Sequence, residues 1–278
     1  MEKFDFLNLD KTIQIADIGA SAINEQPSYT ELLVRNIAHL SAFDGDKRQI
    51  EGMKRAFGDN FTLFEDFLFD GTTQTVYIAD PSSGMTSLYK PNPRVLRFFN
   101  GFDLFGRVEQ EVKVQTRRLD DVPSVPFIDF IKMDIQGAEL TVLKNGTQRL
   151  KDCVAIQLEV SFINLYKDQP MFGEVDSYLR SQGFAPHMFV DIKRWSIAPT
   201  VFQNNFRIPG NQLLEADVVY IKDPIQMDKF SDQQLKKLFI LAHFCFRSVD
   251  LCVHLLLALE KRKVIKINSH QRYLSDFK

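Results

Sequence analysis

Short runs rich in β-branched residues alternate with segments of helical periodicity, and this alternation constrains the fold more than any other feature of the sequence. Residues 12–18 predict a strand that stops at a glycine turn, and residues 27–33 then predict a helix. Residues 37–43 and 128–134 predict further strands, each followed by a turn and a helix. Strands that alternate with helices form a parallel sheet covered on both faces. The sequence therefore predicts a doubly wound, mostly parallel α/β sheet, which would bind ligands at the carboxyl ends of its strands.

The chain divides into a sheet-forming part and a helical end. We expect a domain over residues 1–228, with an insertion at about 80–116, and a C-terminal helical extension and tail over 229–278. The extension is apolar on several helix faces, and such helices must be buried or shared with a partner. We therefore expect a homo-oligomer or a partner protein to contact residues of about 235–260 if the chain itself does not bury them.

Composition excludes several classes of protein. The 278 residues carry 34 Lys and Arg against 36 Asp and Glu, and this formal charge of −2 argues against a nucleic-acid partner. The most apolar stretch, residues 238–259, is interrupted by charged and His side chains, so no membrane span is predicted. The three cysteines are typical of free thiols, and residues 1–10 contain no secretory signal, so we expect a cytoplasmic protein. The 25 Phe predict a core or a contact surface rich in aromatic rings.

The first two predicted strands end in residues suited to a nucleoside-bearing ligand. Gly19 lets the backbone turn tightly, and Asp17 can accept hydrogen bonds from a ligand amine. Asp44 ends the next strand, where a carboxylate can bind both hydroxyls of a ribose. Each residue alone is more often a turn or cap former. Ala20 and Ala22 stand where further glycines would admit a pyrophosphate, so together the residues favour adenosine without a diphosphate, as in S-adenosylmethionine.

A second group of charged residues follows two central strands. Interior strands of parallel sheets are normally apolar, so Lys132, Asp134 and Glu159 need partners there. The structural interpretation is a Lys132–Glu159 ion pair, with Glu139 favoured in the first turn of a helix by the helix dipole. In the functional interpretation, Asp134 or Glu159 accepts a proton from a substrate hydroxyl, and Lys132 positions or tunes that base. The carboxylates have no recognisable metal-ligand spacing, and His187 is a reserve candidate.

Several segments resemble, in order along residues 12–222, the FkbM-type family of S-adenosylmethionine-dependent methyltransferases. The most specific segment is Phe130-Ile-Lys-Met-Asp-Ile-Gln-Gly-Ala-Glu139. The others are residues 15–21, 43–44, 83–88, 118–121, 158–162, 165–166, 169–172 and 215–217. The resemblance implies a Rossmann-like class I fold with a seven-stranded sheet. It also implies an enzyme that methylates hydroxyl groups, often on sugars of glycans or on secondary-metabolite scaffolds.

The resemblance also implies which residues bind the cofactor. Asp17, Gly19 and Ala20 would line the methionine end of S-adenosylmethionine, Ser21 belongs to the same loop, and Asp44 would contact the ribose. Two rivals stay open. One is a nicotinamide-dependent sugar oxidoreductase, which the missing glycines disfavour, and the other is a non-catalytic protein that helps to assemble a glycan-synthesis complex.

The acceptor is a small molecule or a glycan whose identity we expect to depend on two loops. These are residues 80–105 and 193–213, which are rich in Phe, Pro, Asn and Arg. We expect the aromatic rings of the first loop to form an apolar acceptor cleft or lid. They are Phe98, Phe99, Phe102 and Phe105.

Overall fold

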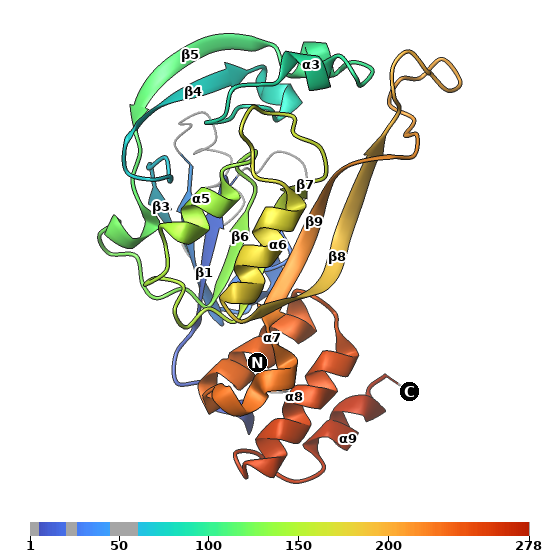
Figure 1. The fold of residues 1–278 in the computed structure, drawn as a ribbon. Helices are drawn as coiled ribbons and strands as arrows, with labels where there is room; N and C mark the ends of the chain where they lie inside the picture. The colour runs from blue at the N-terminus through green and yellow to red at the C-terminus, as the bar shows by residue number, and fades with distance from the viewer. Residues whose placement is uncertain (1–5, 21–26, 45–60, 278) are drawn as a thin grey trace.

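The computed structural model describes residues 6–20, 27–44 and 61–277, and a seven-stranded sheet lies at its centre (Figure 1). The strand order is β3-β2-β1-β6-β7-β9-β8. The strands are β1 (Ile13–Ile18), β2 (Ala38–Phe43), β3 (Phe61–Phe64), β6 (Phe130–Met133), β7 (Ala155–Ser161), β8 (Phe184–Trp195) and β9 (Gln212–Lys222). β9 pairs antiparallel with both of its neighbours, whereas the pairs from β3 to β7 are parallel. The mostly parallel, seven-stranded sheet predicted from the sequence is confirmed.

Successive side chains of each strand point to opposite faces of the sheet, and each face has its own hydrophobic core. Ile13, Ile15 and Phe130 point to one face, where α1 (Thr30–Val34) and the C-terminal helices cover them. Ile18 and Met133 point to the other face, which α5 (Glu139–Lys144) and α6 (Phe172–Ser181) cover. The sheet is therefore covered on both faces, as a doubly wound fold requires.

The C-terminal extension packs on the sheet. It consists of α7 (Asp232–Phe244), α8 (Val249–Lys261) and α9 (Ser269–Ser275), and most apolar residues of α7 and α8 belong to the same core as β1. The ring of Phe130 lies 5.7 Å from that of Phe246, between the sheet and the extension. Burial within the chain therefore accounts for most of the apolar surface of these helices. Contact with a second copy or a partner stays a prediction.

A small second sheet joins the predicted insertion to the strand that directly precedes it. β4 (Thr73–Ala79) pairs antiparallel with β5 (Val108–Gln115), and α3 (Pro93–Leu96) and α4 (Phe102–Phe105) lie between them in the sequence. Three 3-10 turns complete the described elements: η3 (Pro81–Ser83), η4 (Leu119–Asp121) and η5 (Pro224–Lys229). The helix predicted around Ile50, Met53 and Phe57 lies outside the described residues. No helix in the described part of the chain is long and apolar enough to cross a membrane.

Candidate active site

One face of the sheet changes from apolar to polar along its strands. Near the helical extension this face carries buried apolar residues such as Ile13 and Phe130. Every second residue of a strand points to the same face. Toward the carboxyl ends of the parallel strands, the residues on this face are polar instead of apolar. Those in register are Asp17 with Lys132, Lys132 with Gln157, and Glu159 with Asp217. The strand ends therefore form a polar site above an apolar core.

Asp17 is buried in β1 with one carboxylate oxygen unsatisfied. Its Oδ2 accepts a hydrogen bond from the Tyr29 hydroxyl. Its Oδ1 has no hydrogen-bond partner among the described residues, and the Lys132 ammonium lies 3.8 Å away, close enough for an ion pair only. Burial raises the pKa of Asp17, although Lys132 and Tyr29 oppose that shift. A buried acceptor without a hydrogen bond is costly, so this oxygen fits a ligand that brings a donor such as an ammonium group.

Gly19 lies directly after β1, in contact with the end of β6. Its φ of +79° is left-handed, and a Cβ atom there would lie 2.1 Å from the carbonyl oxygen of Asp134. Its backbone N–H donates to the Phe43 carbonyl, and the Asp134 N–H donates to the Ile18 carbonyl. Only glycine fits this approach. The tight turn therefore brings the end of β1 against the strand that carries Asp134.

The other predicted cofactor contacts lie on or next to this turn. Ala20 is buried, and its N–H donates to the Phe43 carbonyl, so it contributes backbone to the turn. Asp44 directly follows β2, which pairs with β1, and it is partly exposed. Ser21 lies outside the described residues. The structure thus brings Asp17, Gly19 and Asp44 to the ends of adjacent strands, and their roles as cofactor contacts stay predictions.

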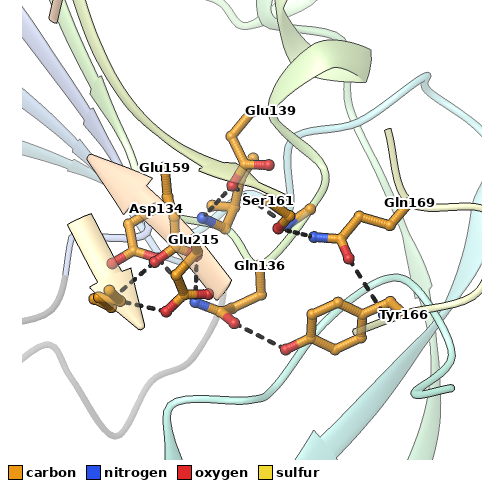
Figure 2. A network of polar contacts seen from close by, with 11 residues as sticks. Asp134, Gln136, Glu139, Glu159, Ser161, Tyr166, Gln169 and Glu215 are labelled. Atoms are coloured by element: carbon orange, nitrogen blue, oxygen red, sulfur yellow. Dashed lines mark hydrogen bonds and ion pairs between the residues drawn. The ribbon is translucent and has the colours of Figure 1, made fainter. Parts of the chain in front are cut away.

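Gln136 joins the two carboxylates that the sequence suggested as bases (Figure 2). Its Nε2 donates to Asp134 Oδ1 at 3.0 Å and to Glu159 Oε1 at 3.3 Å. The two carboxylates differ in environment, because Asp134 is exposed whereas Glu159 is buried. Asp134 is therefore open to solvent, whereas Glu159 is enclosed by its neighbours.

Gln136 is itself held in place from the opposite side. The Tyr166 hydroxyl donates to its Oε1 at 2.8 Å, and the Ser87 hydroxyl donates to its backbone carbonyl at 2.7 Å. Its φ of +53° is left-handed, which costs energy for a residue with a side chain. Segments far apart in the sequence thus converge to fix one amide between two acids.

Lys193 of β8 pairs with Glu159 and with Glu215 of β9. Its Nζ lies 3.0 Å from Glu159 Oε2 and 2.9 Å from Glu215 Oε1. The ion pair expected between Lys132 and Glu159 is therefore wrong, since Lys132 pairs with Asp17 instead. The reason is that β9 brings Glu215 and, through β8, Lys193 to the edge of the same polar face.

Burial and mutual repulsion control the charge of Glu159. Its pKa is raised well above the usual value by burial and by the nearby Glu215 and Asp134, and Lys193 opposes this shift. The pKa of Lys132 is raised, chiefly by Asp17, so this lysine stays protonated. The site therefore combines an accessible carboxylate with a buried glutamate that holds its proton more strongly than an ordinary glutamate does.

Glu139 supports the loop that carries Gln136. Its Oε1 accepts the backbone N–H of Ile135 at 3.0 Å and that of Gly137 at 3.3 Å. Burial raises its pKa to about 7. Gln169 packs against Gly137 and donates to the Ser161 hydroxyl at 2.6 Å. Glu139 thus begins α5 and fixes the turn before it, which agrees with the structural interpretation of this residue.

His187 is wrong as a reserve catalytic residue. It lies near the beginning of β8, and its Nε2 is 3.0 Å from the Ser248 hydroxyl at the start of α8. Because β8 runs parallel to β7, its beginning lies at the opposite edge of the sheet from the polar site. Burial lowers the pKa of His187, as expected for a structural residue.

The sequence interpretation missed three side chains of this candidate site: Gln136, Tyr166 and Lys193. The first two stand in segments that carry the family resemblance, and that was the available signal. Lys193 gave no signal, because its partners depend on the position of β9 beside β7.

In the described ranges, no group of three or more His, Cys, Asp or Glu side chains is arranged to hold a metal ion.

Comparison with known proteins identifies similar sequences and folds. Residues 11–186 match the family model described as the methyltransferase FkbM domain. The chain is 28% identical over 162 residues to the 2-O-methyltransferase NoeI of Sinorhizobium fredii, and the match covers 56% of this chain and 66% of that protein, just under two thirds.

Two solved structures are similar to this chain at low sequence identity. One is a precorrin-6y C5,15-methyltransferase from Geobacter metallireducens, with a TM-score of 0.39, 13% identity, and coverage of 80% of this chain and 86% of that one. The other is the magnesium protoporphyrin IX methyltransferase of Synechocystis with bound S-adenosylmethionine, with a TM-score of 0.37, 9% identity, and coverage of 76% and 71%.

Proposed function

Because the chain belongs to the methyltransferase FkbM family, and so uses S-adenosylmethionine, we propose that it methylates a hydroxyl oxygen of a sugar, a glycan or a similar small metabolite. The observation that carries this proposal is the pair of carboxylates, Asp134 and Glu159, that Gln136 joins at the strand ends. A hydroxyl is a poor nucleophile until its proton is removed, and a positioned carboxylate supplies that base.

The ends of β1 and β2 fit the cofactor. The unsatisfied Oδ1 of Asp17 would accept from the amine, Gly19 and Ala20 would line the methionine end, and Asp44 would accept from the ribose hydroxyls. When bound, S-adenosylmethionine supplies an electrophilic methyl group. The chain's own residues then have two tasks, which are to align the acceptor and to remove one proton.

Asp134 is the residue that we assign as the base. It is exposed at the end of β6, so an acceptor oxygen can approach it, and its carboxylate would take the hydroxyl proton. Glu159 is buried and contacts both Gln136 and Lys193, so it would position the amide that orients Asp134. Lys132 would balance the charge of Asp17 and tune the acids around it.

The name of the Sinorhizobium relative, a 2-O-methyltransferase, supports oxygen as the accepting atom. The pattern of acids and amides on the polar face also suits hydroxyl groups, because each carboxylate or amide oxygen can accept from a sugar O–H. The second observation favours an acceptor with several hydroxyl groups.

The test is a search for the methylated product. Purified protein and S-adenosylmethionine with an isotopically labelled methyl group are added to sugars, oligosaccharides and cell extracts, and mass spectrometry detects acceptors that gain one methyl group. We expect the label on a hydroxyl oxygen of a sugar-bearing product. Label on nitrogen or carbon would contradict the proposal. Binding of S-adenosylhomocysteine without any transfer would favour the non-catalytic role in a glycan-synthesis complex.

A further inference from the structure

The carboxyl end of β8 continues into a projecting lobe with exposed apolar side chains. Figure 1 shows β8 and β9 running beyond the sheet at the end opposite α7, α8 and α9. We call residues 94–107 and 194–211 the distal lobe. Its large exposed apolar side chains are Phe98, Leu104, Ile197, Val201, Phe202 and Phe206. Exposed apolar side chains gathered in one part of a molecule mark an interaction surface.

The two segments of the distal lobe form one folded unit. The Ala198 N–H donates to the Phe98 carbonyl at 2.9 Å, and the Trp195 indole N–H donates to the Asn100 carbonyl at 2.9 Å. Beneath them, the Phe102 ring packs edge to face on Trp195 with 5.0 Å between centroids. The exposed rings are therefore carried by a scaffold whose two segments are hydrogen-bonded and packed against each other.

The distal lobe is also strongly basic. It carries five arginines and one aspartate, a net charge of +4, in a chain whose formal charge is −2. The arginines are Arg94, Arg97, Arg107, Arg194 and Arg207, and all are exposed. Within the part of the chain that the structure describes, none of them has an ion-pair partner, although Arg207 stacks over the rings of Phe105 and Phe206.

We propose that the distal lobe binds the surface of a membrane that contains anionic phospholipid. Guanidinium groups pair with phosphate oxygens, and Phe and Leu side chains enter the boundary between headgroups and acyl chains. Charge complementarity selects this occupant over an uncharged apolar one. Because β8 runs parallel to β7, the lobe lies at the same edge of the sheet as the candidate active site, so lipid binding would place that site beside the membrane.

Vesicle binding tests this proposal with the full chain and without cofactor or acceptor. Sedimentation with vesicles of phosphatidylcholine, with or without phosphatidylglycerol, should show binding that requires the anionic lipid and weakens with added salt. The Arg97→Gln/Arg194→Gln variant should lower the partition coefficient by about five-fold for each arginine removed. The Val201→Ser/Phe202→Ser variant should lower it by about ten-fold or more.

A matched control removes exposed apolar side chains from the opposite end of the molecule. Ile225 and Ile267 are 90% and 76% exposed, and the Ile225→Ser/Ile267→Ser variant should bind vesicles as the unaltered protein does. The proposal is overturned if the unaltered protein ignores anionic vesicles, or if both lobe variants bind them normally. It is equally overturned if the apolar variant only dissociates a dimer in light scattering, because the surface would then bind a second copy. Since no methyl transfer is measured, these outcomes are independent of the proposed reaction.

Discussion

Gln136 keeps a side chain in a backbone conformation that most residues avoid. Its φ of +53° would suit glycine better, yet its amide is the group that contacts both Asp134 and Glu159. Strain of this kind persists where the surrounding structure supports it, often at functional sites. The sequence motif contained this residue, but periodicity assigns no role to a loop amide, so only the contacts in the folded chain reveal its place.

Replacing Gln136 should therefore impair turnover more than folding. Gln136→Ala removes two hydrogen bonds to carboxylates, and we expect the rate of methyl transfer to fall by about ten-fold or more. Calorimetry should show that S-adenosylhomocysteine binds as before, because the cofactor contacts that we assign lie on β1 and β2. An unchanged rate would mean that the amide does not position the base.

Glu139 should make stability depend on pH. Burial raises its pKa from 4.5 to about 7, so the folded chain holds a proton that the unfolded chain has already released between these values. The free energy of unfolding therefore falls as pH rises through this window. The Glu139→Gln side chain can still accept hydrogen bonds from the loop amides, but it does not titrate. The free energy of unfolding of this variant, relative to that of the unaltered protein, should therefore be higher at pH 8 than at pH 4 by on the order of 3 kcal/mol.

Denaturant unfolding at a series of pH values measures this difference. The comparison between the two proteins isolates Glu139, because the other buried acids titrate in both. Parallel pH profiles would show that Glu139 keeps its ordinary pKa in the folded protein.

The packing of β1 against β6 depends on the absence of a side chain at their junction. Gly19 and Gly183 share nearly the same left-handed backbone, with φ of +79° and +78°. A Cβ atom on Gly183 would meet nothing within 4 Å, whereas one on Gly19 would meet the Asp134 carbonyl. Gly183→Ala should cost about 1–2 kcal/mol. Gly19→Ala should cost at least about 3 kcal/mol and abolish binding of S-adenosylhomocysteine.

Thermal unfolding and calorimetry on the two variants separate backbone strain from steric contact. Equal losses of stability would contradict the close approach of the two strands. The strand–glycine–helix pattern predicted this turn from the sequence. It could not predict that the glycine contacts Asp134, because the pairing of β1 with β6 joins residues far apart in the chain.

The C-terminal helices stabilise the sheet that they cover. Phe239 of α7 is fully buried, whereas Leu257 of α8 is 43% exposed. We expect Phe239→Ala to lower the free energy of unfolding by about 3–5 kcal/mol, because it leaves a cavity between the sheet and α9. Leu257→Ala should cost less than about 1 kcal/mol.

Chemical denaturation measures both losses. A small effect of Phe239→Ala would mean that the extension folds apart from the sheet. The helical pattern predicted two apolar helices and left open whether the chain or a partner buries them. Periodicity could not decide, because the face that receives them is created only when the sheet forms.

At the scale of the whole molecule, the sequence predicted a mostly parallel sheet but not the antiparallel strand β9 near one edge of it. Local patterns identify each strand, yet the reversed β9 between β7 and β8 follows from the path of the whole chain. That reversal brings Glu215 and Lys193 to the site and extends β8 into the distal lobe. Phe99 and Phe102, expected in an acceptor cleft or lid, are buried in the base of the lobe instead. The near-neutral charge of the whole chain likewise gave no indication that the distal lobe is basic.

Turnover of the Asp134→Asn variant, measured together with binding of S-adenosylhomocysteine, tests most directly whether Asp134 is the base. Asp152→Asn, at an exposed aspartate just before β7, is the matched control. We expect Asp134→Asn to lower the rate of methyl transfer by about 100-fold or more, with unchanged binding of S-adenosylhomocysteine, and Asp152→Asn to change neither. Full turnover by Asp134→Asn would contradict the assignment of Asp134 as the group that accepts the proton of the acceptor hydroxyl.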